Sequence, residues 1–320
     1  MNIIQKINPK KIKIFFIIFL ALLIINFLFF TSIPVDSNIE NGKIVTIKKG
    51  DSIKSASTTL KKNGIINSSS LFNFLINFYD SQVVEGDYLF QGKNSLISVI
   101  KRVNIGDYQI PSVRITLFEG MTVDQMGKEL SAKLDTFDAE SFVALAKNKE
   151  GFLFPDTYNF KKNISPEEVI LIMTKNFENK IAENFDEISK SEYSIEEIVT
   201  MASIIEKEAT ADTFQEVSNV LWKRIKIGMA LQVDAPFVYY INKGTFDLTM
   251  SDLETDHPYN TYRNTGLTPT PIGNPGIRAI LAAANPQPTN NIYFLTGRDN
   301  EMYFATDLEG HRRNRFLYLD

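Results

Sequence analysis

The sequence has no cysteine, and among its 320 residues it has only two histidines and one tryptophan. Without cysteine, disulfide bonds, thiolate zinc sites and cysteine nucleophiles are excluded. His257 and His311 alone supply little for a histidine-based metal site or a Ser-His-Asp triad. We therefore expect no metal and no cofactor, and any chemistry must come from carboxylates, hydroxyls, amides or amines.

Basic residues are also scarce, and their distribution is uneven. The chain has 34 Lys and Arg against 38 Asp and Glu, a formal net charge of −4. Four of the lysines lie within the first thirteen residues, which leaves 30 basic against 38 acidic residues in the rest of the chain. This acidic remainder disfavours nucleic acid as a partner. The short basic cluster at residues 311–315 is expected to be a solvated surface.

One long apolar run lies near the N-terminus. Residues 14–30 contain a single polar member, Asn26, and extension to residue 33 gives a helix long enough to cross a ~30 Å hydrocarbon layer. Lysines precede the run and acidic residues follow it, so the positive-inside rule places residues 1–13 in the cytoplasm and the remainder outside. The alternative is a cleaved signal peptide, but the run exceeds a signal core and no A-x-A-like cleavage site follows. We expect an uncleaved transmembrane helix over residues 14–33.

After a polar linker at residues 34–43, a strand, a turn and a helix start are predicted twice. Ser52 is the expected helix N-cap in the first copy, and Thr122 with Gln125 has capping-box spacing in the second. The first copy resembles the opening of LysM-like glycan-binding modules, although any well-capped strand-turn-helix unit shares this pattern. We assign residues 44–112 to a LysM-like subdomain.

Residues 113–320 are expected to form a second, larger domain. Helical patterns are predicted at residues 123–134, 139–148, from 166 onward, 194–209 and 212–227. A stretch rich in Pro, Gly and Asn follows at residues 257–288, which is typical of functional loops on a rigid scaffold. The predicted fold class is α+β: a small β-rich N-terminal unit and a mixed α+β domain.

Glu206 lies on the apolar side of the predicted helix 194–209. Ser194 and Glu197 form a capping-box pattern that fixes its start, and the helical period then places Glu206 on the face of Val199 and Ala202. Glu197 and Glu208 fall on the other side, where they can face water. Burial raises the pKa of a carboxyl group toward values useful for a general acid. The alternative is a structural ion pair of Glu206 with Arg224 or Arg278.

Several ordered segments resemble the YceG-like endolytic murein transglycosylases, the MltG family. The segment around Glu206, Ala202 to Glu208, is similar to the catalytic-helix motif of that family. The other similar segments are Glu150 to Tyr158, Asn219 to Asp234, Asp252 to Tyr262 and Gly266 to Gly276. Thr268, Thr270 and the Ala235-Pro236 pair depart from the family pattern, and these departures concern loop shape.

The resemblance implies a lytic transglycosylase with Glu206 as its single catalytic residue. Glu206 would protonate the oxygen of a MurNAc–GlcNAc linkage and then accept the proton of the MurNAc C6 hydroxyl, leaving a 1,6-anhydro end. Because that hydroxyl is already tethered, no second carboxylate is needed. The candidate residues for binding glycan are Gln232, Tyr259, Asn260 and Tyr262. The candidate supporting acids are Asp234 and Glu254.

The resemblance also implies partners and a location. Glycan strands of peptidoglycan, the membrane and peptidoglycan synthases are the expected partners, and the chain is expected in the bacterial cytoplasmic membrane with its catalytic part outside. One alternative is a non-catalytic anchored scaffold, which does not need Glu206. Another is an inverting glycan hydrolase in which Glu206 works with Asp234 or Glu254, the two carboxyls about 6.5–9.5 Å apart.

Overall fold

The computed structural model describes residues 17–20, 22, 39, 42–244 and 247–319. The chain divides into two compact units, Met1–Pro111 and Ser112–Asp320. Most of the predicted transmembrane helix, 14–33, lies outside the described residues. Among the residues that are described, no helix is both long enough and apolar enough to cross a membrane.

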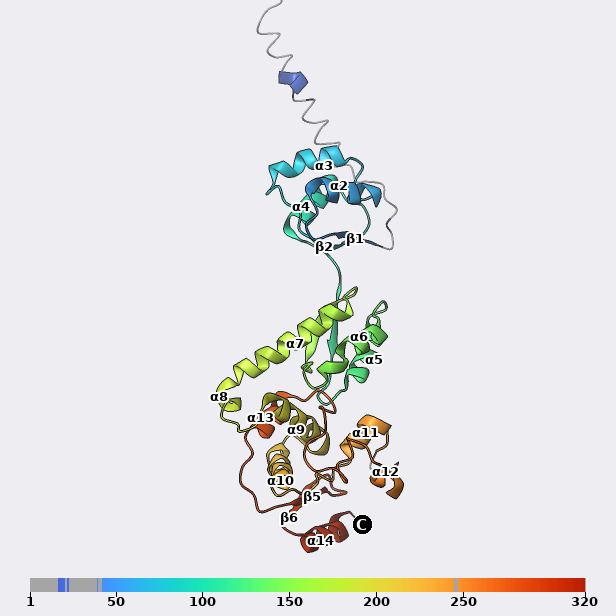
Figure 1. The fold of residues 1–320 in the computed structure, drawn as a ribbon. Helices are drawn as coiled ribbons and strands as arrows, with labels where there is room; N and C mark the ends of the chain where they lie inside the picture. Colours follow the sequence, from blue (N-terminus) through green and yellow to red (C-terminus); the bar gives the residue numbers. More distant parts are fainter. Residues whose placement is uncertain (1–16, 21, 23–38, 40–41, 245–246, 320) are drawn as a thin grey trace, which may run out of the picture. The chain divides into compact units, whose positions relative to one another are not determined.

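The first unit combines short helices with one antiparallel strand pair (Figure 1). Its elements are β1 (Lys43–Ile47), α2 (Ile53–Lys62), α3 (Ser69–Leu75), the short 3-10 helix η1 (Ile76–Phe78), β2 (Gly86–Phe90) and α4 (Leu96–Ile105). Val45 of β1 lies opposite Tyr88 of β2, and both side chains are buried in the core of this unit. Ser52 caps α2, as predicted, by accepting a hydrogen bond from the Ser55 amide. The expectation of a β-rich unit is wrong, because its two strands are only five residues each and its core is mainly helical.

The second unit begins with another strand pair and the helices that pack on it. Its first elements are β3 (Ser112–Thr116), α5 (Val123–Lys133), α6 (Ala139–Ala146), the 3-10 helix η2 (Lys147–Lys149), β4 (Thr157–Lys161), α7 (Pro166–Glu183) and α8 (Phe185–Ile188). Ile115 of β3 lies opposite Tyr158 of β4 in an antiparallel register. The capping box of Thr122 and Gln125 forms at the start of α5 as predicted. The strand, turn and helix of the first unit therefore do recur here.

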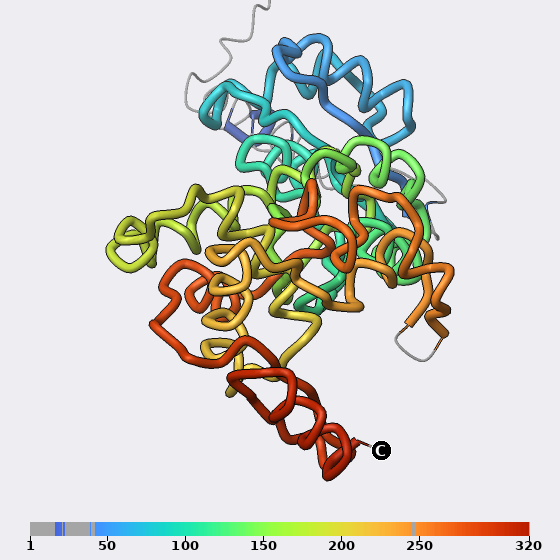
Figure 2. The backbone as a smooth tube through the Cα atoms, turned by 60° about the horizontal axis from the view of Figure 1, so that its bottom comes forward, coloured from blue at the N-terminus to red at the C-terminus, as the bar shows by residue number. Residues whose placement is uncertain are grey.

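The rest of the second unit surrounds one central helix. Its elements are α9 (Ile195–Glu208), α10 (Phe214–Lys226), α11 (Ala235–Ile241), α12 (Met250–Glu254), α13 (Ile277–Ala284), β5 (Tyr293–Thr296), β6 (Met302–Ala305) and α14 (Leu308–Tyr318). Helices α10, α11 and α13 all pack on α9. The β5–β6 pair and α14 project from this helical part, as Figures 1 and 2 both show. The second unit is thus a mixed α+β domain in which α9 forms the centre of a largely helical core.

Helix α9 begins and ends where the sequence predicted, but its surroundings differ from the prediction. Ser194 and Glu197 form the expected capping box, and Ala209 ends the helix. Every residue from Ile198 to Ile205 is buried, so α9 has no solvent-facing side along its middle turns. The buried surface of α9 is therefore wider than the predicted apolar face, because neighbouring helices enclose α9 on several sides. Polar side chains emerge only at the two ends of α9, and at its last turn Glu206 is half-buried.

Candidate active site

The carboxyl group of Glu206 lies at the start of a neighbouring helix. Its Oε2 accepts a hydrogen bond from the Gly276 amide at 2.9 Å, and Gly276 is the N-cap residue of α13. The first amides of a helix have no partner inside the helix and carry partial positive charge, which favours an anion. This contact gives the ionised form of Glu206 one defined stabilising donor.

A second carboxylate, Glu119, lies against the same glycine. A Cβ atom built on Gly276 would stand only 1.8 Å from Glu119 Oε1, so a larger residue there would displace the Glu119 side chain. Glu119 is exposed, and its side chain reaches Gly276 from the turn between β3 and α5. Gly120, which follows it, has a φ of +77° and lets the chain turn tightly beside the Glu206 side chain. The carboxyls of Glu119 and Glu206 therefore meet at one backbone position.

These surroundings raise the pKa of Glu206. Burial is the largest cause, because it penalises the charged form, and the negative charge of Glu119 acts in the same direction. The Gly276 hydrogen bond and the charges of Lys207 and Arg278 lower the pKa, but the net direction is upward. A larger fraction of Glu206 is thus protonated near neutral pH than for a solvated glutamate, as a general acid requires.

The alternative of a structural pair between Glu206 and an arginine is not supported by the described contacts. Arg224 donates to the backbone oxygens of Leu231 and Ile292. Arg278 donates to the Ala211 oxygen at 2.9 Å and reaches Asp212 at 3.4 Å. Neither guanidinium forms an ion pair with Glu206 in the part of the chain that the structure describes.

Asn274 fixes the loop that carries Gly276. Its side chain is fully buried; its Oδ1 accepts from the amides of Gly151 and Leu153 at 2.9 and 3.0 Å. Its Nδ2 donates to Glu150 at 2.8 Å, and its backbone oxygen accepts from the Gly120 amide at 2.7 Å. One side chain thus joins segments that are more than 120 residues apart in sequence. The sequence alone does not single out Asn274, because a lone asparagine in a Pro-rich loop has the pattern of an ordinary turn residue.

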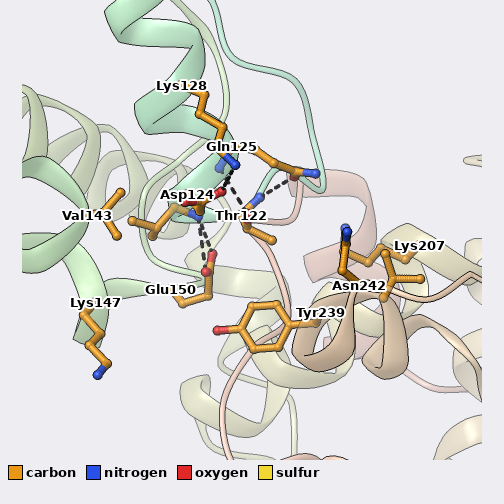
Figure 3. A pocket seen from close by; sticks show the side chains of 12 residues that line it. Thr122, Asp124, Gln125, Lys128, Val143, Lys147, Glu150, Lys207, Tyr239 and Asn242 are labelled. Carbon is orange, nitrogen blue, oxygen red and sulfur yellow. Dashed lines mark hydrogen bonds and ion pairs between the residues drawn. The ribbon is translucent and has the colours of Figure 1, made fainter. Parts of the chain in front are cut away.

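A cavity of about 570 Å³ opens on the other side of the turn at Gly120 (Figure 3). Lys207 lines it, and its Nζ donates to the Gly120 oxygen at 2.8 Å. Glu150 also lines it, and accepts bonds from the Val123 amide at 3.1 and 3.2 Å. Burial raises the pKa of Glu150 to about 7, although these donors and Lys207 oppose the shift. A single backbone turn at Gly120 therefore separates Glu206 from a polar cavity.

Three of the predicted site residues lie around Glu208. Gln232, Asp234 and Tyr262 line a separate cavity of about 480 Å³ together with Glu208 and Arg224. Residues two apart on a helix differ by about 200° in direction, so Glu208 points away from Glu206. The structure therefore brings these predicted residues to Glu208 and not to Glu206.

The sequence-based expectation that Glu208 can face water is wrong, because the side chain is engaged by its own protein. Its Oε1 accepts from the Ala235 amide at 2.9 Å. Burial raises its pKa to about 7, with the charge of Asp234 adding to the shift and Arg224 opposing it. Tyr262 donates to Asp234 Oδ1 at 2.6 Å, which fixes that carboxylate beside Glu208. Glu197, by contrast, is exposed as predicted.

The remaining predicted residues occupy different places. Asn260 is fully buried; its Nδ2 donates to the oxygens of Leu253 and Thr255 and its Oδ1 accepts from the Tyr262 amide. These bonds hold its own loop, so the prediction that Asn260 contacts glycan is not supported. Tyr259 is half-buried, and its hydroxyl lies 2.6 Å from the Thr270 hydroxyl. Glu254 is exposed at the end of α12, where its backbone oxygen accepts from Arg263.

Comparison with known proteins agrees with this geometry. The YceG-like family matches residues 45–316. An endolytic murein transglycosylase of Bacillus subtilis (strain 168) is 30% identical over 318 residues, which cover 89% of this chain and 87% of that protein. An endolytic murein transglycosylase of Streptococcus pneumoniae (strain D39) is 25% identical over 96% of this chain, and the match covers 65% of that longer protein. A 2.6 Å crystal structure of a yceG-like protein from Listeria monocytogenes covers 86% of this chain and 99% of its own, with 30% identity and a TM-score of 0.57. The chain therefore belongs to the YceG-like family.

Proposed function

We propose that this chain is an endolytic murein transglycosylase, a lyase that cuts the MurNAc–GlcNAc linkages of peptidoglycan strands. The observation that carries the proposal is the half-buried carboxyl of Glu206, whose raised pKa favours a proton donor and whose ionised form has the Gly276 amide as a partner. The relative from Bacillus subtilis, named for this activity, matches most of the chain. Together the site chemistry and the family membership point to the same reaction.

The reaction requires Glu206 to act first as an acid and then as a base. Its proton passes to the glycosidic oxygen as the bond from that oxygen to C1 of MurNAc breaks. The Glu206 carboxylate then accepts the proton of the C6 hydroxyl as that oxygen bonds to C1, which regenerates the acid and leaves a 1,6-anhydro end. The Gly276 amide stabilises the carboxylate between the two steps, and burial, with the charge of Glu119 adding to it, raises the pKa of Glu206 toward proton donation.

The position of Glu119 next to Glu206 also favours a second candidate function, that of a hydrolase. Glycosidases that use water need two carboxylates on either side of the linkage, one acid and one base or nucleophile. Glu119 and Glu206 both adjoin Gly276, whereas the predicted second acids do not lie there: Asp234 lines the Glu208 cavity and Glu254 is on α12. In a hydrolase Glu119 would activate the water, and the products would carry reducing ends.

Location and partners are part of the proposal. Residues 14–33 would anchor the chain in the bacterial cytoplasmic membrane with the second unit outside, which is supported by the apolar run and by the lysines before it. The first unit, in which Ser52 caps a helix that follows a strand, would act as a LysM-like glycan-binding module. Termination of strands during synthesis would bring peptidoglycan synthases close as partners.

The experiment that tests this proposal identifies the chemical ends that the enzyme leaves on cleaved glycan strands. The full chain in detergent is incubated with uncrosslinked glycan strands, and the products are analysed by mass spectrometry. We expect anhydro-MurNAc ends, lighter by one water than hydrolysis products, from cuts within the strands. Reducing ends would support the hydrolase, and strands left intact by a chain that still binds them would support a scaffold.

A further inference from the structure

The cavity beside Glu206 is built from several elements and is large enough for a ligand. The start of α5 contributes Thr122 and Gln125, α6 and its end contribute Val143 and Lys147, and α11 contributes Tyr239. Its volume of about 570 Å³ falls within the usual range of roughly 300–1,000 Å³ for small-ligand sites. Figure 3 shows these side chains around one hollow, with Glu150 between α5 and Tyr239.

The cavity is positively charged although the chain is acidic. Lys128, Lys147 and Lys207 line it, against the carboxylates of Asp124 and Glu150. Asp124 is already paired with Lys128 at 2.6 Å. Glu150 is buried, bonded to the Val123 amide and to Asn274, and its pKa of about 7 leaves it only partly ionised at neutral pH. Excess positive charge therefore remains, chiefly at Lys147, which forms no ion pair among the residues at 42–244 and 247–319.

The cavity is also close to the site of bond cleavage. Lys207 follows Glu206 on α9, and its Nζ is bonded to Gly120, the residue whose Cα faces the Glu206 side chain. A substituent on the sugar that Glu206 protonates needs to pass only this turn to enter the cavity. In murein, the substituent next to the cut is the peptide stem, an acidic peptide attached to each MurNAc.

We propose that this cavity binds the peptide stem of the MurNAc residue at the cut linkage, through the carboxylates of the stem. The inference rests on the proposed function and names the part of the substrate that the cavity recognises. Lys147 attracts the stem carboxylates, while Thr122, Gln125 and Tyr239 provide hydroxyl and amide groups for its peptide bonds. A neutral sugar ring would gain nothing from the ammonium groups.

Binding tests this inference without relying on turnover. The full chain carrying Glu206→Gln is mixed with strands that bear stems and with strands stripped of stems by an amidase, and the Kd for each is measured. Stemmed strands should bind more tightly. Lys147→Gln should weaken binding of stemmed strands about two- to fivefold, because it removes one solvent-exposed charge interaction, and should leave stripped strands unaffected.

Lys133→Gln is the matched control, because Lys133 is an exposed lysine of the same helix α5 that does not line the cavity. Equal Kd values for stemmed and stripped strands, or equal effects of Lys147→Gln and Lys133→Gln, would overturn the inference. If Tyr239→Ala weakens both kinds of strand equally and Lys147→Gln has no effect, the cavity binds a sugar instead. Reducing ends in the product assay would overturn the proposed reaction but leave a stem-dependent Kd intact.

Discussion

Glu206 and Glu208 occupy the same turn of α9, and both have a raised pKa, yet their surroundings differ. Glu208 takes hydrogen bonds from the backbone amides of both Asp234 and Ala235 and lies among Tyr262 and Arg224. Glu206 accepts one amide bond, from Gly276. Its Oε1 accepts no hydrogen bond from the part of the chain that the structure describes. One carboxyl is thus engaged by its own protein, and the other keeps an oxygen for a ligand.

The comparison shows that a raised pKa alone does not identify a catalytic acid. Burial raises the pKa at both positions, and a neighbouring carboxylate adds to it at both, Glu119 in one case and Asp234 in the other. Proton transfer further requires a free oxygen within hydrogen-bond reach of the substrate. Glu206 has an oxygen that no described group of the chain engages, whereas Glu208 holds the start of α11 in place.

The largest expected difference between the two residues is in activity. Glu206→Gln keeps the side-chain volume and removes the transferable proton, so kcat/KM for strand cleavage should fall by at least about 10²–10⁴-fold. Glu208→Gln should keep activity within about tenfold, because it alters only the support of α11. Both values come from the same assay of anhydro ends. Equal losses in the two variants would contradict the assignment of Glu206 as the catalytic acid.

A smaller difference is expected in stability between the Glu206 side and the Glu208 side of α9. Asn274→Ala leaves the buried amides of Gly151 and Leu153 without acceptors and frees Glu150, so the free energy of unfolding should fall by about 2–5 kcal/mol. On the Glu208 side, Tyr262→Phe removes one hydrogen bond to Asp234 and should cost about 1 kcal/mol. Urea unfolding of both variants measures this.

An exposed asparagine provides the control for that measurement. Asn264 donates to the oxygens of His257 and Asn260 near the surface, and Asn264→Ala should change stability less than Asn274→Ala. If Asn274→Ala and Asn264→Ala destabilise equally, the buried bonds of Asn274 do not organise the site.

Local chemistry made the helices of the site predictable from sequence. The capping boxes at Thr122 and Ser194 form as predicted, because each depends on residues three apart in the chain. Trp222 of α10 is buried and donates to the Ala283 oxygen. The place of Glu206 on α9 was predictable for the same reason, since it follows from the helical period.

Contacts between distant segments were not predictable in this way. Glu119 reaches Gly276 across more than 150 residues of sequence, and the sequence marks its turn only as part of a repeat. The sequence does not reveal the burial of Asn260 and Glu208, because that burial depends on loops and helices from elsewhere in the chain. The only local indication that Glu119 lies in a tight turn was the glycine that follows it, and Gly120 does have a positive φ of +77°.

The stability of the wild type should depend on pH differently from that of the Glu208→Gln variant. The folded pKa of Glu208 is about 7, above the ordinary value of 4.5, so the folded state binds the proton more tightly than the unfolded state. Its contribution to stability is therefore complete below about pH 4.5 and is lost as the pH rises through about 7. Melting temperatures of the wild type should fall across this window more steeply than those of Glu208→Gln. Parallel curves would mean that Glu208 titrates normally in the folded chain.

The smallest expected effect concerns Glu119 and the pH profile of catalysis. The negative charge of Glu119 raises the pKa of Glu206, so Glu119→Gln should lower that pKa. In the proposed reaction cleavage needs protonated Glu206, so kcat/KM should fall as the pH rises through the pKa of the free enzyme. The descending alkaline limb of the kcat/KM profile should therefore move to lower pH, with activity retained at acidic pH.

Glu140→Gln, a change of another carboxylate that is the first-turn acid of α6, is the control and should leave the limb in place. The same Glu119→Gln variant distinguishes the two candidate reactions, because a hydrolase that relies on Glu119 to activate water would lose activity at every pH. A transglycosylase needs Glu119 only to set the pKa of Glu206, since the C6 hydroxyl is already held on the sugar that reacts. A shift of the alkaline limb with anhydro-MurNAc ends would therefore show that Glu119 acts by setting the pKa of Glu206. A loss of activity at every pH would show that Glu119 takes part in the chemical step, as in the hydrolase.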